Sequence, residues 1–154
     1  MTHAISPPAT SYESDLNLWV EITISQLKAQ NFDELDIDNL IEELEGLSGR
    51  DRRELKQRLT TLLEHLLKRC YVQSDRDYAG WQDAIARTRI KIRDIFRQSP
   101  SLKNYVNSPE LFQQAFEDAL FIVRSQSGYS SVKFPDDWEF RKDIETILSV
   151  NFWE

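Results

Sequence analysis

The sequence predicts an all-α fold, a single helical bundle of five or six helices, and three observations support this. Apolar residues recur every three or four positions over most of the chain, which is the spacing of one face of an α-helix. Four glycines and five prolines in 154 residues are too few for a many-turned β fold. All five prolines lie outside the interiors of the expected helices. A chain of this length can enclose one core, so we expect one domain over residues 12–154 after a flexible arm of residues 1–11.

The first expected helix runs from about Tyr12 to Ala29, with Thr10 and Glu13 spaced as in a capping box. Leu18 and Ile22 lie on the side away from its main apolar face. A helix that is apolar on two sides needs two partners, so these two residues form a candidate self-association face. The main face, which we expect to pack inward, consists of Leu16, Trp19, Val20, Thr23 and Leu27.

Two further helices are expected next, separated at a pair of glycines. The first begins near Asp36, a suitable N-cap, and ends between Gly46 and Gly49, because glycine commonly follows a helix end. It should pack across the bundle as a short connector. The second runs from about Arg50 to Val72 and carries the strongest helical pattern in the chain. Its broad apolar face consists of Leu55, Leu59, Leu62, Leu63, Leu66, Leu67 and Cys70.

The remaining helices follow a break at residues 73–80. One runs from about residue 81 to residue 98 and ends before Pro100, because proline disfavours helical geometry in the residue before it. The next begins with Ser108 as the cap and Pro109 in the first turn, and ends near residue 126. A last helix is expected over residues 136–149 after an extended connection. The main core should form from the helices at 12–29, 50–72, 81–98 and 109–126.

One short stretch places a carboxylate, an imidazole and the single thiol of the chain close together in sequence. Glu64 and His65 are adjacent, about 100° apart around a helix, and cannot face one another. His65 and Cys70 are five residues apart, whereas metal sites and catalytic pairs on one helix use spacings of three or four. We therefore interpret His65 as the edge of the apolar face and Cys70 as core, and we assign no catalytic residue.

The acidic stretch of residues 33–45 suggests a carboxylate metal site as an alternative. Di-metal four-helix proteins use two Glu-x-x-His elements, and neither His65, with leucine at position 62, nor His3 belongs to one. We interpret the stretch as a solvated acidic face, and we assign no metal ligand and no cofactor. A metal-dependent enzyme that combines His65 with acids from another helix stays open as the least favoured alternative.

Arg89, Arg93 and Arg97 recur every four residues and form a basic stripe on one helix face. Such a stripe can bind phosphates, so a nucleic-acid-associated protein is the second hypothesis. The net charge of −7 argues against it, because nucleic-acid binders are usually basic overall. Pairing of the stripe with the acidic stretch of residues 33–45 is the simpler explanation.

Charge is distributed unevenly along the chain. Residues 1–49 hold ten acids and one base, a net charge of −9, whereas residues 50–103 carry +7 and residues 104–154 carry −5.

The single cysteine excludes an intrachain disulfide and agrees with a reducing compartment. The sequence has no signal-peptide pattern and no apolar run of about 18 residues, so we expect a cytoplasmic protein with no membrane partner.

Eight sequence blocks occur in an order that is typical of one family. They are YESDLNLWV, FDELDIDNLIEELEGLSGRDRREL, LLEHLLK, Trp81, IRDIFRQSPSL, AFEDAL, the FP at residues 134–135 and the terminal NFWE. In these blocks the chain resembles a bacterial family called domain of unknown function 29, over about residues 12–154. The resemblance implies an all-α bundle and supplies no catalytic residues, because the family has none assigned.

The leading functional hypothesis is therefore a non-enzymatic protein-interaction module that binds another protein or a second copy of itself. The second apolar face of the first helix and the uneven charge favour this hypothesis, and so does the lack of any catalytic pattern. Substrate, partner and biological process are beyond what the sequence indicates.

Overall fold

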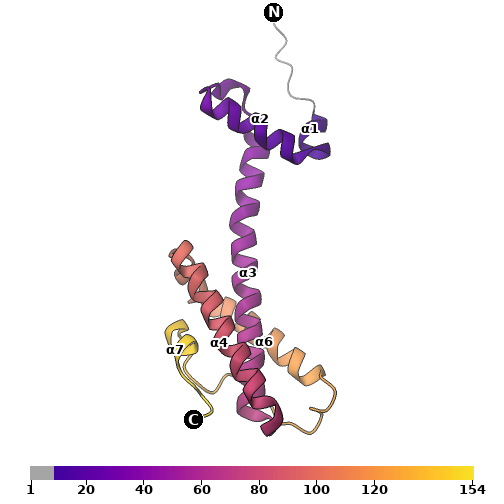
Figure 1. Cartoon of the computed structure of the whole chain (residues 1–154), viewed down its shortest axis with the longest axis vertical. Helices are drawn as coiled ribbons and strands as arrows, with labels where there is room; N and C mark the ends of the chain where they lie inside the picture. Colours follow the sequence, from indigo (N-terminus) through magenta and orange to yellow (C-terminus); the bar gives the residue numbers. More distant parts are fainter. Residues whose placement is uncertain (1–8) are drawn as a thin grey trace, which may run out of the picture. The chain divides into compact units, whose positions relative to one another are not determined.

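The computed structural model describes residues 9–154, and this part of the chain folds into seven α-helices and one 3-10 helix without a strand (Figure 1). The predicted all-α class is confirmed. The chain divides into two compact units, residues 1–49 and residues 50–154, here called the N-terminal unit and the C-terminal unit. Of the expected flexible arm, residues 1–8 lie outside the described residues.

The N-terminal unit is built from short helices and the beginning of a long one. The first expected helix is divided into two helices at Asp15. The Asp15 carboxylate accepts a hydrogen bond from the backbone N–H of Leu18 at 3.0 Å and so caps the second of them. A short polar side chain that bonds to nearby backbone favours a helix start over a helix interior, which explains the division. The elements are α1 (Ala9–Ser14), α2 (Leu16–Lys28), η1 (Phe32–Glu34) and the first part of α3 (Ile37–Tyr71).

The long helix α3 corrects a prediction. We expected one helix to end between Gly46 and Gly49 and another to begin at Arg50, but α3 is continuous over 35 residues. A glycine that ends a helix adopts a positive φ, and Gly128 is the one described glycine that does so. A glycine inside a helix costs about 1 kcal/mol relative to alanine, which good helix formers on both sides can offset.

The C-terminal unit holds the hydrophobic core. The apolar face predicted for residues 50–72 is buried, because the six leucines from Leu55 to Leu67 are each at most 1% exposed. The faces of α4 and α6 pack against it within one cluster of buried side chains, and both helices run beside this part of α3 in Figure 1. The elements that follow α3 are α4 (Asp75–Gln98), α5 (Leu102–Val106), α6 (Pro109–Ser125) and α7 (Ile144–Ser149).

The end of the chain differs from the expected helix over residues 136–149. Only Ile144–Ser149 are helical, and Asp143 caps this short helix by accepting the N–H of Thr146 at 3.0 Å and its hydroxyl at 2.7 Å. Trp138 lies before the helix and is buried against four aromatic rings at centroid distances of 5.2 to 6.2 Å. Trp138 is therefore buried by tertiary packing of a non-helical segment, whereas the buried Ile144, Ile147 and Leu148 belong to α7. The rings around Trp138 are Phe112, Phe116, Phe140 and Phe152.

Candidate functional site

Two of the three reactive groups in the Leu62–Cys70 stretch, His65 and Glu64, interact with neighbours in their own helix. The His65 Nδ1 atom lies 2.8 Å from the carbonyl oxygen of Thr61, one turn earlier in the same helix. The Glu64 carboxylate accepts a hydrogen bond from the Lys68 ammonium group, with 3.0 Å between Oε1 and Nζ, and both side chains are largely buried. Within residues 9–154, no group of three or more His, Cys, Asp or Glu side chains is arranged to hold a metal ion.

Cys70 has an environment that suppresses its chemistry. Burial raises the pKa of its thiol to about 11, and Arg69 lowers it only partly. A thiol with a raised pKa stays protonated at neutral pH, and the protonated form is a poor nucleophile and a poor metal ligand. Cys70 is half-buried and lies outside the cluster of buried core residues, so it is at the edge of the core and not within it as expected.

The arginine stripe on α4 contacts the end of α7. Arg89 is 7% exposed, and its Nε and Nη2 atoms donate hydrogen bonds to the carbonyls of Ile147 and Val150 at 3.1 Å and 2.5 Å. Arg93 donates to the carbonyl of Leu148. The last carbonyls of a helix lack helical partners and carry the negative end of its dipole, so two guanidinium groups complement them.

These contacts change one interpretation of the stripe. We expected carboxylates of residues 33–45 as its partners, whereas the partners of Arg89 and Arg93 are main-chain carbonyls at the end of α7. Arg97 differs from the other two, because it is largely exposed and pairs with Asp94 on its own helix. Nucleic-acid binding by the three arginines stays a prediction.

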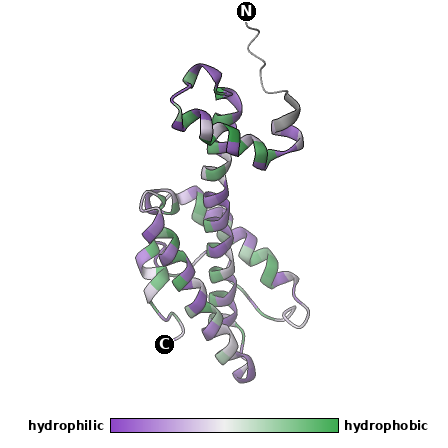
Figure 2. Ribbon diagram, turned by 45° about the horizontal axis from the view of Figure 1, so that its top comes forward, coloured by the Kyte–Doolittle hydropathy of each residue, from purple (hydrophilic) through white to green (hydrophobic). Residues whose placement is uncertain are grey.

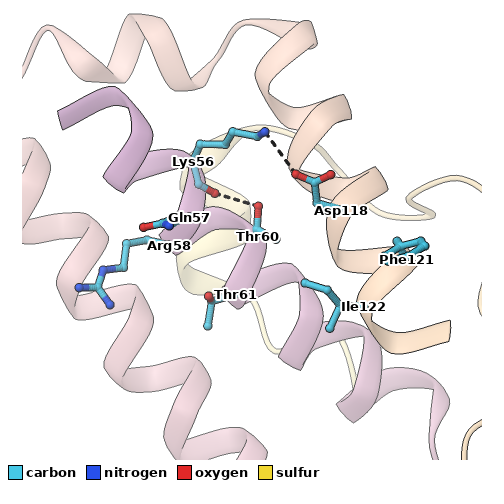
Figure 3. Close-up of a pocket in the computed structure, with 8 residues that line it drawn as sticks. All are labelled: Lys56, Gln57, Arg58, Thr60, Thr61, Asp118, Phe121 and Ile122. Atoms are coloured by element: carbon cyan, nitrogen blue, oxygen red, sulfur yellow. Dashed lines mark hydrogen bonds and ion pairs between the residues drawn. The ribbon is translucent and has the colours of Figure 1, made fainter. Parts of the chain in front are cut away.

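An open hollow of about 550 Å³ lies between α3 and α6 in the C-terminal unit (Figure 3). Lys56 reaches from α3 towards Asp118 on α6, and the two charges are 3.2 Å apart. Thr60 donates its hydroxyl to the Lys56 carbonyl at 2.9 Å, and Phe121 at the edge is 73% exposed. The described residues that line the hollow include no cysteine or histidine, and its lysine is paired with Asp118.

The N-terminal unit carries most of the exposed apolar surface of the described chain. Ten of its large apolar side chains over residues 16–47 are 38% to 60% exposed, whereas Ile22, Leu35 and Leu40 are half-buried, and in residues 12–49 only Trp19 and Thr23 are buried. Hydrophobic and hydrophilic segments alternate along the helices of this unit in Figure 2. The exposed set consists of Leu16, Leu18, Val20, Ile24, Leu27, Phe32, Ile37, Ile41, Leu44 and Leu47.

The exposed residues form helical stripes, and this corrects the expected inward face. Of the five residues predicted to pack inward from α2, Trp19 and Thr23 do so, whereas the other three are exposed. Trp19 packs edge-on against Tyr12 at a centroid distance of 4.9 Å, and the Tyr12 hydroxyl donates to Glu43 at 2.6 Å. With the spacing of one helix face, the α2 stripe consists of Leu16, Val20, Ile24 and Leu27, and the α3 stripe of Ile37, Ile41 and Leu44.

Leu18 and Ile22, the predicted self-association face, lie in a separate hollow of the same unit. The hollow measures about 540 Å³ and is lined by both residues together with Glu21 and Glu34. Leu18 is 44% exposed and Ile22 is half-buried. The structure therefore places these two residues beside open space and next to carboxylates.

The surroundings of these stripes are negative. Ten acids lie between residues 13 and 45, with Lys28 as the one base in residues 1–49. None of the ion pairs among residues 9–154 uses any of these acids. The hydrogen bond to Glu43 is the main cause that raises the pKa of Tyr12 to about 12, and Glu42 and Asp36 contribute through their charges.

Sequence reasoning missed the α2 and α3 stripes as candidate binding residues. The available signal was the number of large apolar residues in a segment of fewer than fifty residues, because such a short segment can bury few of them by itself. We used their spacing to assign an inward face. Spacing identifies a face but not the element that covers it.

The chain belongs to the family described as domain of unknown function DUF29, whose model matches residues 11–153. No curated protein and no solved structure matches the chain. Among the described residues, no helix has the length and apolar character needed to cross a membrane.

Proposed function

We propose that this DUF29 member is a non-enzymatic protein-interaction module and that its N-terminal unit supplies the binding surface. The observation that supports the proposal is the exposure of ten large apolar side chains over residues 16–47. Exposed apolar stripes, such as those of α2 and α3, mark interaction sites in folded proteins, because their burial against a partner is favourable. The partner is another protein or a second copy of the chain.

The absence of an enzymatic role is part of the same proposal. His65 and Glu64 are engaged with neighbours in their own helix, and the Cys70 thiol has a raised pKa of about 11. Activated nucleophiles and general bases need the opposite conditions, namely an adjacent base or a pKa near the working pH. Cys70 as a free thiol also supports a cytoplasmic, reducing location.

Site-specific photo-crosslinking in the native cells tests this function. A photoreactive amino acid replaces Leu44, which is 57% exposed, and in a control protein it replaces the exposed Gln82 of α4. We expect adducts of defined mass from position 44 and none of the same mass from position 82. If neither position gives a discrete adduct, the N-terminal unit is not a binding surface.

A further inference from the structure

We propose that the occupant of the N-terminal unit is a basic amphipathic α-helix of another protein. This inference rests on the proposed function and adds the chemistry of the partner. Helix-in-groove recognition uses apolar anchors on one face of the bound helix, and the surrounding charges select the partner. The described residues of this unit can be compared with both requirements, namely apolar anchoring positions and surrounding charge.

The dimensions of the stripes fit a helix. The α2 stripe extends from Leu16 to Leu27, which corresponds to about 16 Å at 1.5 Å per residue. The α3 stripe extends from Ile37 to Leu44, which corresponds to about 10 Å. Three turns of a partner helix therefore match the α2 stripe and two turns match the α3 stripe, and its apolar residues would follow the same spacing of three and four.

Charge distinguishes between possible occupants. Residues 1–49 carry a net charge of −9, and their acids form no ion pair within residues 9–154. The same segment of a second copy would bring ten more acids, and an anionic lipid surface would also be repelled. A helix with lysines or arginines beside its apolar face gains attraction from the carboxylates that lie near it.

The carboxylates stand close enough to the apolar residues to act on a bound helix. Glu21 and Glu34 line the same hollow as Leu18 and Ile22. On α3, Glu42 and Glu45 directly follow exposed apolar residues and are themselves exposed. The surface therefore combines apolar anchoring positions with a negative border, which is the complement of a basic amphipathic helix.

Binding of designed peptides to the full-length protein tests the inference. The probe is a labelled 21-residue helix of leucine and lysine with leucines at helical spacing. One control peptide has the same composition in scrambled order, and the second replaces every lysine by glutamate. Fluorescence anisotropy measures binding at low and at high salt. We expect the probe to bind at least about tenfold more tightly than either control, and to weaken at high salt.

Matched variants localise the binding. Ile24→Ser with Leu44→Ser removes two apolar anchors from exposed positions, and E42Q with E45Q removes two negative charges. The control E110Q with D137N makes the same charge change in the C-terminal unit. We expect both N-terminal variants to lose affinity by about fivefold or more and the control to keep it. Circular dichroism confirms that every variant retains its helices.

Each other outcome overturns the inference in a distinguishable way. Equal binding of the scrambled peptide shows attraction by charge alone, and equal binding of the glutamate peptide shows apolar contact without charge selection. A dimer in light scattering that the I24S/L44S variant loses identifies a second copy as the occupant and leaves the proposed function intact. If no peptide binds, the protein is a monomer and position 44 gives no crosslink, both this inference and the proposed function are overturned.

Discussion

The two parts of α3 have the same apolar periodicity and opposite environments. In residues 55–67 the leucines are at most 1% exposed, whereas in residues 37–47 Ile37, Ile41, Leu44 and Leu47 are 48% to 57% exposed. Both sets follow the spacing of an amphipathic helix. The difference shows that periodicity predicts a helix and its apolar face, but that burial depends on the neighbouring elements that cover this face.

The largest expected effect is in the buried part of α3. Leu62→Asp places a charge at a position that is 0% exposed, in the centre of the core cluster. A buried, unpaired carboxylate is strongly unfavourable, so we expect a loss of about 4 kcal/mol or more in the free energy of unfolding. Thermal unfolding followed by circular dichroism measures it. A cooperative transition at the original temperature would contradict the core position of Leu62.

The second-largest effect is expected at the contact between Arg89 of α4 and the end of α7 in the C-terminal unit. Arg89→Ala leaves the carbonyls of Ile147 and Val150 without their guanidinium donor. We expect a loss of about 2 to 3 kcal/mol in urea unfolding, because hydrogen bonds from a charged donor to these carbonyls are lost. Arg97→Ala is the matched control, and its exposed side chain should contribute less than about 0.5 kcal/mol. Equal effects of the two substitutions would rule out the anchoring role of Arg89.

Cys70, near the end of the buried part of α3, provides a pH test. Burial raises the pKa of its thiol from 9.0 to about 11, so the folded protein favours the protonated form. The contribution of the protonated Cys70 thiol to the free energy of unfolding is fully present below pH 9 and is lost as the pH rises towards 11. At pH 8 we expect the thiol to react with a disulfide reagent more slowly than a free peptide cysteine does. A rate equal to that of the peptide would show that the thiol is not buried.

The smallest effect is expected in the exposed part of α3. Leu44→Asp makes the same chemical change as Leu62→Asp, but at a position that is 57% exposed. Surface substitutions usually alter stability by about 0.5 kcal/mol or less, so the unfolding temperature of the isolated protein should hardly change. Partner binding should nevertheless be lost. Destabilisation comparable to that of Leu62→Asp would mean that residues 37–47 are covered within the protein itself.

Sequence reasoning succeeded where one local signal determines the outcome. Ser108 and Pro109 predicted the start of α6, and the leucines from Leu55 to Leu67 predicted the core face of α3. It failed where the outcome depends on distant segments. The spacing of Arg89 and Arg93 predicted a stripe, but their carbonyl partners lie 55 to 61 residues further along the chain.

The candidate binding surface shows the same contrast between what a local signal predicts and what depends on other segments. Leu18 and Ile22 were identified from the two-sided apolar character of one helix, and they line an open hollow. Leu16, Val20 and Leu27 were assigned to the interior because they share a face with Trp19, which is buried. Helical spacing places these residues on one surface, but it contains no information about where along that surface the covering element ends.

Hydroxyl-radical footprinting of side chains tests the central comparison most directly, because it compares the two parts of α3 in one molecule. In the isolated protein at low concentration, we expect strong oxidation of Ile41 and Leu44 and protection of Leu59, Leu62 and Leu66, in line with their exposed fractions. Addition of the leucine–lysine helix should protect the first pair and leave the second group unchanged. Equal protection of both parts of α3 before any partner is added would contradict the account.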